Sequence, residues 1–120
     1  MKLLIAGSRN LLPRIKFLDT LVWEQCGLEP TEIISGGAKG VDSQAKEYAE
    51  ALCLPFKVFE ADWDKYGKSA GYRRNKIMAT YADELLAIWD GESKGTSHMI
   101  DIMHELGKPV HIVILQSLCT

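Results

Sequence analysis

Short aliphatic runs alternate along the chain with segments in which apolar residues recur every three or four positions. The runs are apolar almost throughout, which is typical of parallel strands that are buried on both faces. Glycine or proline separates most runs from the neighbouring segments, as expected where strands and helices end. The pattern predicts five strands, at residues 2–6, 32–35, 56–60, 84–89 and 110–115.

The segments between the strands have the spacing of helices that cover a sheet. The first helix is expected to begin after Pro13 and to end at Gly27, and the last to end at Gly107. The predicted sheet-facing stripes are Ile15, Leu18 and Val22; Val41, Ala45, Ala49 and Leu52; Arg74, Ile77, Met78 and Tyr81; and Met99, Met103 and Leu106. Four helices therefore alternate with five strands.

This alternation predicts an α/β fold of the Rossmann-like type, a three-layer αβα sandwich around a five-stranded, mostly parallel sheet. A length of 120 residues with 47% hydrophobic content suits one core, so residues 1–120 are expected to form a single domain. In such sheets ligands bind beyond the carboxyl ends of the strands, near the topological switch point. The loops after the first, second and fourth strands therefore form the candidate site.

The net charge, the cysteines and the length of the apolar runs indicate which partners and which cellular compartment to expect. Sixteen acidic against fourteen basic residues leave a net charge of −2, which provides no broad basic surface and argues against nucleic acid as a partner. Cys26, Cys53 and Cys119 are widely spaced, which fits reduced thiols in a cytoplasmic protein. No stretch approaches the ~20 apolar residues that a membrane span requires, so no membrane partner is expected.

The loop after the first strand carries Gly7, Ser8 and Arg9. A glycine lets a ligand approach the backbone, and a serine hydroxyl and a guanidinium can both hydrogen-bond a phosphate. An ordinary strand-to-helix turn with an exposed arginine explains the same residues equally well. They become ligand-binding candidates in combination with the two other loops at the same edge of the sheet.

The loop after the second strand is rich in glycine and opens directly into a helix. Free N–H groups and the helix dipole favour an anion at such a place, and the candidates are Gly36, Gly37, Ala38, Gly40 and Asp42. The spacing is that of neither a Walker A loop nor a GxGxxG motif. Asp42 either caps the helix or accepts hydrogen bonds from a ribose hydroxyl or a base.

The loop after the fourth strand has the same character, with Asp90, Gly91, Gly95, Thr96 and Ser97 as candidates. Its hydroxyl groups lie at a predicted helix start, where a phosphate needs donors. Two such helix starts at one edge of a sheet favour a shared anion-binding crevice over two unrelated helix caps.

The connector before the third helix and the helix itself add two candidates. Trp63 can stack on a base or cover the edge of the sheet. Arg74 belongs to a sheet-facing stripe, where an unpaired charge is costly, and so indicates an anionic partner.

No metal site or catalytic nucleophile is predicted. His98, His104 and His111 are too dispersed along the chain to suggest a ligand cluster. There is no GxSxG elbow, and no cysteine stands beside an obvious base. We therefore assign no metal, no cofactor and no catalytic residue from the sequence.

Five segments form a combination that is more specific than any single glycine loop. They are Gly-Ser-Arg at 7–9, Ser-Gly-Gly-Ala-Lys-Gly-Val-Asp at 35–42, Ala-Asp-Trp at 61–63, Gly-Tyr-Arg-Arg-Asn-Lys-Ile-Met at 71–78 and Gly-Thr-Ser-His-Met at 95–99. Together they resemble the YspA-type SLOG family, formerly DUF2493. The SLOG superfamily also includes the Lonely Guy phosphoribohydrolases and DNA-processing protein A. The resemblance implies a Rossmann-like domain that binds nucleotides or nucleotide-derived molecules, and homo-oligomers are common in the superfamily.

The resemblance also assigns residues by position. Arg74 matches an arginine of the Lonely Guy active site, and Asn75 follows it in the same motif. Lonely Guy enzymes place acidic residues important for glycosidic-bond cleavage shortly after their Gly-Thr pair, where this chain has Ser97 and His98, which argues against hydrolysis. Their Pro-Gly-Gly is replaced by residues 89–91, so Asp90 adds a charge to the loop.

The sequence thus predicts a SLOG-type domain that binds a nucleotide-derived small molecule, such as an ADP-ribose or NAD-related molecule, as a sensor or processing domain. One alternative is a hydrolase of the N-glycosidic or phosphoester bond, with Asp42 or Asp90 as general base. A less favoured alternative is a single-stranded DNA-binding protein. Enzymatic activity therefore stays open at this point.

Overall fold

A five-stranded parallel sheet forms the centre of the fold. The computed structural model describes residues 1–8, 11, 15–27, 30–37 and 40–115. The strands are β1 (Lys2–Gly7), β2 (Glu32–Ser35), β3 (Phe56–Val58), β4 (Glu84–Trp89) and β5 (Val110–Ile114). They lie in the order β3-β2-β1-β4-β5, and every adjacent pair is parallel. This confirms the predicted α/β sheet of the Rossmann-like type.

The helices lie between the strands in the chain, as the apolar spacing predicts. The first, α1 (Ile15–Leu21), continues as a π-helix, η1 (Val22–Cys26), and ends at Gly27 in a left-handed conformation. The others are α2 (Val41–Ala51), α3 (Trp63–Tyr66), the 3₁₀ helix η2 (Gly67–Ser69), α4 (Ala70–Tyr81) and α5 (Lys94–Glu105). No helix among the described residues is long and apolar enough to cross a membrane.

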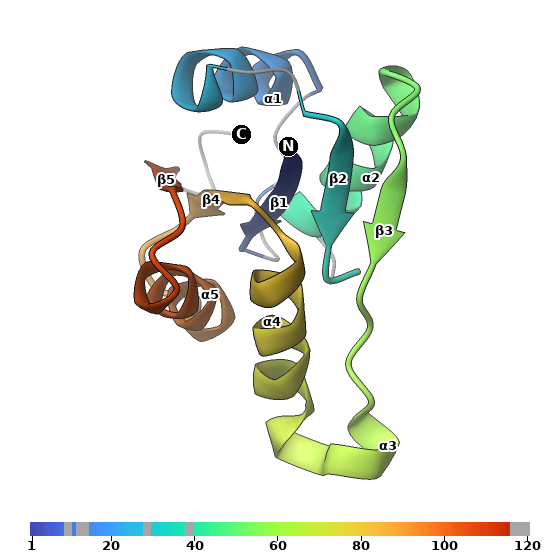
Figure 1. Ribbon diagram of the computed structural model, residues 1–120, viewed down its shortest axis with the longest axis vertical. Coiled ribbons are helices and arrows are strands. Elements are labelled where there is room, and N and C mark those ends of the chain that lie inside the picture. Colours follow the sequence, from blue (N-terminus) through green and yellow to red (C-terminus); the bar gives the residue numbers. More distant parts are fainter. Residues whose placement is uncertain (9–10, 12–14, 28–29, 38–39, 116–120) are drawn as a thin grey trace.

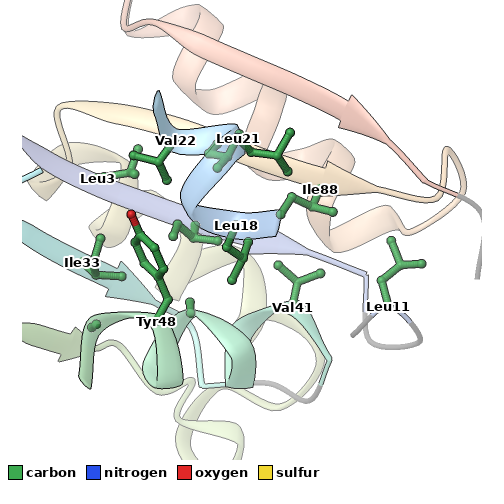
Figure 2. Packing of buried hydrophobic residues seen from close by; sticks show 13 residues of the cluster. Leu3, Leu11, Leu18, Leu21, Val22, Ile33, Val41, Tyr48 and Ile88 are labelled. Atoms are coloured by element: carbon green, nitrogen blue, oxygen red, sulfur yellow. The ribbon is translucent and has the colours of Figure 1, made fainter. Parts of the chain in front are cut away.

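Two hydrophobic clusters hold the helices on opposite faces of the sheet. Successive side chains of a strand point to opposite faces. Accordingly, Leu3 of β1 packs with α1 and α2, whereas Leu4 packs with α4 and α5. Figure 2 shows the first cluster, in which Leu18 of α1 and Tyr48 of α2 meet the strands. Helices therefore cover both faces, and α4 and α5 lie side by side (Figure 1), which gives the predicted three-layer sandwich.

Three residues that were predicted to face the sheet are exposed instead, and one of them is Leu52, which follows the end of α2 and is 42% exposed. Ile77 of α4 is 58% exposed, whereas Asn75 and Met78 of the same helix are buried. Leu106 follows the end of α5 and is 48% exposed. Leu52 and Leu106 lie just beyond the ends of their helices, whereas in α4 the polar Asn75 occupies a buried position that the apolar spacing did not assign to it.

The connector between β3 and α4 is partly helical, which the sequence did not reveal. β3 ends at Val58, two residues earlier than predicted, and α3 begins after a short extended segment. The Asp62 side chain caps α3 by accepting a hydrogen bond from the N–H of Lys65 at 3.1 Å. In Figure 1, α3 lies at the end of α4 that is remote from the sheet.

Gly7 lies at the end of β1, where β4 and α2 approach the backbone closely. A Cβ there would collide with the carbonyl oxygen of Ile88 and would lie 2.6 Å from Cγ2 of Val41. We expect Gly7→Ala to lower the free energy of unfolding by about 2–3 kcal/mol, because β4 and α2 cannot both withdraw without opening the core. Urea denaturation measures this change.

The matched control is Gly95→Ala. A Cβ at Gly95 would meet no atom within 4 Å, and the residue lies in the first turn of α5. This variant should therefore be as stable as the parent or more stable by up to about 1 kcal/mol. Equal stability of the Gly7→Ala variant and the parent would contradict the proposed crowding at the sheet edge.

Candidate functional site

A cavity of about 390 Å³ opens at the carboxyl ends of β1, β2 and β4, and we call it the main pocket. It is lined by Ala6, Gly7, Ser8, Gly36, Asp42, Arg74, Asn75, Met78, Asp90, Ser93, Gly95, Thr96 and Met99. β1 lies between β2 and β4: the chain runs from β1 to β2 and β3 on one side and then crosses back to β4 and β5 on the other side. Such a switch point is the place where ligands bind in open α/β sheets.

Ser8 joins the loops that form the main pocket. Its side chain is buried, and its Oγ accepts a hydrogen bond from the N–H of Asp90 at 3.0 Å. Its backbone N–H donates to the carbonyl of Ile88 at 3.2 Å, and its carbonyl accepts from the N–H of Val41 at 3.4 Å. Ser8 therefore ties the end of β1 to the end of β4 and to the start of α2.

Asp90 shapes the turn that leads from β4 to α5. Its Oδ1 accepts hydrogen bonds from the N–H groups of Glu92 at 2.8 Å and Ser93 at 2.9 Å. These two bonds stabilise the ionised carboxylate and hold the pKa of Asp90 below its usual value. The main pocket therefore contains a negative charge at neutral pH.

The first turn of α5 faces the main pocket. Ser93 is the N-cap residue, but its side chain makes no capping hydrogen bond. Thr96 is buried, and its hydroxyl donates to Oγ of Ser93 at 3.3 Å. N–H groups in a first helical turn have no carbonyl partner within the helix, so this end is positively polarised. An anion placed here would meet both the helix N–H groups and two hydroxyl groups.

Arg74 reaches from α4 to the loop after β2. Its Nη1 donates to the carbonyl oxygens of Gly36 at 2.7 Å and of Phe59 at 3.3 Å. A Cβ on Gly36 would lie 2.7 Å from this Nη1 and 3.2 Å from Oδ2 of Asp42. The guanidinium and the carboxylate thus converge on Gly36. Backbone carbonyl oxygens therefore compensate part of the positive charge of Arg74, for which the sequence analysis expected an anionic ligand.

Asn75 links α4 to α5. Its side chain is 5% exposed, accepts a hydrogen bond from Nε of Arg74 at 3.0 Å, and places Nδ2 3.1 Å from Nδ1 of His98. Burial is the main factor that lowers the pKa of His98 below its usual value, so the ring is neutral at pH 7 and can accept this hydrogen bond. The ring of Tyr72 packs edge-on against His98, with the ring centroids 4.4 Å apart.

A second, more open cavity shares the β4–α5 segment with the main pocket, and we call it the adjacent groove. It has a volume of about 470 Å³ and is lined by Tyr72, Trp89, Gly91, Glu92, Lys94, Ser97, His98 and Asp101. Three of these residues carry aromatic rings, whereas the main pocket has none among its described lining residues. The adjacent groove thus offers aromatic rings that the described lining of the main pocket lacks.

The structure brings most of the predicted site residues together. Nine line the main pocket: Gly7, Ser8, Gly36, Asp42, Arg74, Asn75, Asp90, Gly95 and Thr96. Gly91 and Ser97 line the adjacent groove. Gly37, Gly40 and Trp63 line neither cavity, and Trp63 is 55% exposed on α3. Arg9 and Ala38 lie outside the described residues.

Four lining residues of the main pocket were missed by the sequence analysis: Ala6, Met78, Ser93 and Met99. Ser93 has a signal that could have found it, because a serine directly before a helix start is a preferred N-cap. Met78 and Met99 lie four and three positions after Arg74 and Thr96 in the sequence, on the same helical faces. Their apolar side chains indicated core positions and gave no sign of a pocket.

Comparison with known proteins places the chain in a family. It is 32% identical over 117 residues to the Gene 61 protein of Mycobacterium phage D29, a match that covers 91% of this chain and 93% of that protein. The chain belongs to the family of this phage protein. No family model matches the chain.

A solved structure shares the fold of this member of the Gene 61 protein family. The X-ray structure of DNA processing protein A (DprA) from Streptococcus pneumoniae matches with a TM-score of 0.73 and 20% sequence identity. The match covers 98% of this chain and 52% of that chain, so the chain spans about half the length of DprA. At this identity the likeness establishes the Rossmann-like fold alone.

The hydrogen bonds of Asp90 predict a pH dependence of stability. A carboxyl group whose pKa is lowered by folding stabilises the protein above its unfolded pKa of about 3.9, and this stabilisation is lost as the pH falls through the folded pKa. We expect Asp90→Asn to be less stable than the parent at pH 7 and the difference to shrink below about pH 4. Urea denaturation at a series of pH values measures it.

Glu92→Gln is the control, because it removes the same charge from an exposed neighbour. A surface substitution of this kind usually changes stability by less than about 0.5 kcal/mol. A constant difference between the Asp90→Asn variant and the parent from pH 7 to pH 3 would show that the ionised carboxylate does not stabilise the turn.

Proposed function

We propose that this protein binds a nucleotide or a nucleotide-derived molecule, such as an ADP-ribose or NAD-related compound, as a sensor or processing domain. The observation that carries the proposal is the first turn of α5, which lines the main pocket together with Arg74 and Asp42. Residues 1–120 would form a single domain of this kind. The similarity of five sequence segments to the YspA-type SLOG family supports the same assignment.

The phosphate group would bind at the start of α5. The first-turn N–H groups favour an anion, and the hydroxyls of Ser93 and Thr96 lie 3.3 Å apart beside them. Arg74 adds a positive charge to the same pocket, and its bonds to backbone carbonyls keep the guanidinium fixed in place. A fixed donor loses little side-chain entropy when a ligand binds.

The carboxylates select for a ligand that also carries hydroxyl groups. Asp42 is 8% exposed, and both Asp42 and Asp90 line the main pocket. An ionised carboxylate offers several acceptor positions, which suits the vicinal hydroxyls of a ribose. Among the described lining residues, two carboxylates and one guanidinium face the pocket, and this balance disfavours a densely charged polyphosphate. The pocket therefore fits a nucleoside with one or two phosphates better than a triphosphate.

The base would extend into the adjacent groove. Tyr72 presents an exposed ring that packs edge-on against His98, and Trp89 lines the same groove. Aromatic rings bind nucleobases by stacking, with a free energy of about 1–3 kcal/mol per base. Tyr72 thus takes the role that the sequence analysis gave to Trp63.

A second candidate function is hydrolysis of the bound nucleotide. The presence of Asp42 and Asp90 in one pocket favours it, because a carboxylate can act as general base toward water. DNA binding is the third candidate, since DprA is named for DNA processing. A net charge of −2 leaves little electrostatic attraction for a polyanion, so we rank it below the other two.

Loss of the Thr96 hydroxyl should weaken ligand binding. We expect isothermal titration with ADP-ribose, NAD and AMP to show binding of at least one of them. We expect Thr96→Val to raise the dissociation constant about tenfold, the equivalent of one hydrogen bond to a charged group. Thr80→Val is the matched control, because Thr80 is an exposed residue of α4 whose hydroxyl donates to the carbonyl of Lys76 at 2.9 Å.

The same samples distinguish binding from turnover. Release of free base or ribose phosphate during incubation would identify the protein as a hydrolase, whereas recovery of intact ligand supports a sensor. The proposal fails if none of the three ligands binds. It also fails for the α5 site if Thr96→Val and Thr80→Val bind the ligand equally well.

Tyr72 and Trp63 give a separate test of where the base binds. Both side chains are exposed, at 50% and 55%, but only Tyr72 lines the adjacent groove. We expect Tyr72→Ala to raise the dissociation constant for AMP by about tenfold, because a stacking contact is lost. Trp63→Ala should leave it unchanged. The opposite result would restore the original assignment of Trp63 and exclude the groove as the base site.

A further inference from the structure

Three side chains of different chemistry meet at the other end of the sheet from the main pocket. Cys26 is the last residue of η1, Glu84 is the first residue of β4, and His111 is the second residue of β5. The thiol sulfur, a carboxylate oxygen and a ring nitrogen all lie within 4.8 Å of one another. Among the described residues, no other group of three or more potential metal ligands is as close.

The fold brings these residues together through the register of the sheet. His111 of β5 pairs with Leu86 of β4, and Glu84 lies two residues before Leu86 on the same face of that strand. Leu86 belongs to the hydrophobic cluster that α1 and η1 cover, and Cys26 packs against this cluster. Glu84 and His111 therefore extend from the sheet toward the end of η1.

We propose that Cys26, Glu84 and His111 bind a zinc ion, at a site that is separate from the nucleotide site proposed above. Thiolate, imidazole and carboxylate are the three ligand types that zinc takes in proteins. Tetrahedral zinc places a sulfur and a nitrogen ligand about 3.6 Å apart, and a nitrogen and an oxygen ligand about 3.4 Å apart.

The observed spacing is close to these values. Nε2 of His111 lies 3.2 Å from Oε2 of Glu84, which already matches a shared ion. The Cys26 sulfur lies within 4.8 Å of the other two ligand atoms, so binding one ion requires it to approach them by at most about 1 Å. The side chains of His111 and Glu84 keep exposed fractions of 23% and 18%, which leaves room for water as a fourth ligand. Three protein ligands and one water form an open zinc site.

A hydrogen bond of 3.2 Å between Nε2 of His111 and Oε2 of Glu84 holds these two side chains together when no ion is bound. Burial, together with the charge of Glu84 and a hydrogen bond to it, raises the pKa of the Cys26 thiol to about 11. The thiol therefore keeps its proton at neutral pH in the metal-free protein. Zinc binding forms a bond from the ion to the thiolate sulfur, and the thiol proton is released to solvent.

The ion would join the π-helical end of the first helix to the edge of the sheet. β5 is an edge strand, and it pairs with β4 alone among the described strands. A ligand that binds only the folded protein raises its stability by mass action, so zinc should raise the thermal midpoint. Glu84 and Asp90 stand at opposite ends of β4, about 20 Å apart at the usual rise per strand residue.

Cobalt substitution tests the site directly. We would use the full chain with Cys53→Ser and Cys119→Ser, which leaves Cys26 as its single thiol. Titration with Co²⁺ under a non-thiol reductant should give one bound ion per chain, with a thiolate-to-cobalt charge-transfer band in the near ultraviolet. Adding Zn²⁺ should remove the band and raise the thermal midpoint.

The ligand variants are Cys26→Ser, Glu84→Gln and His111→Gln in the same background, with His104→Gln as the matched control on the exposed surface of α5. Cys26→Ser should abolish the charge-transfer band. The other two should weaken Co²⁺ binding by more than about tenfold, since even the loss of an outer-shell partner has that effect. Circular dichroism checks that each variant is folded, and His104→Gln should bind like the parent.

Two results would overturn the proposal. The first is the absence of a thiolate-to-cobalt band in the folded single-thiol protein. The second is unchanged Co²⁺ affinity after His111→Gln or Glu84→Gln. Neither result bears on the nucleotide site, because AMP or ADP-ribose binding is measured separately and in the presence of a chelator.

Discussion

The buried hydroxyl of Ser8 is the interaction on which the candidate site depends. A buried hydroxyl needs a partner, and here it accepts the N–H of Asp90, so the loop after β4 is held against the end of β1. This is possible because Gly7, which has no side chain, lets Val41 and the backbone of β4 approach closely. Backbone contacts around Ser8 therefore fix the distances between the loops that line the main pocket.

Arg74 illustrates how shaping a pocket differs from binding a ligand. Its guanidinium donates to the carbonyls of Gly36 and Phe59, so it holds the loop after β2 in place whether or not an anion is present. Removal of Arg74 would leave these two partly buried carbonyls without this donor and would move the loop. A loss of binding in an Arg74 variant would therefore not identify a ligand contact. Thr96 is more informative, because within the described part of the chain its hydroxyl bonds only to Ser93.

The sequence predicted the features that depend on local pattern. The apolar runs located the five strands, and the glycine loops with their polar residues located the pocket edge, including Gly36 and Thr96. Features that depend on packing between distant segments were not predicted. Tyr72 lines the groove because α4 meets α5, and Trp63 does not because α3 caps the far end of α4. Residues 26, 84 and 111 are widely separated in sequence, and only the strand register shows that they meet.

β4 connects the two polar sites while keeping them electrically independent. Its residues Leu85, Leu86 and Ile88 are fully buried, and the strand carries Glu84 at one end and Asp90 just beyond the other. At a separation of about 20 Å the Coulomb interaction is about five times weaker than at a contact distance of about 4 Å, so charge at one end has a small effect at the other. A displacement at one end of a strand that is packed on both faces does reach the other end, because close-packed interiors resist deformation. An ion at the Glu84 end would therefore influence the main pocket through the stability of the sheet, and not through its charge.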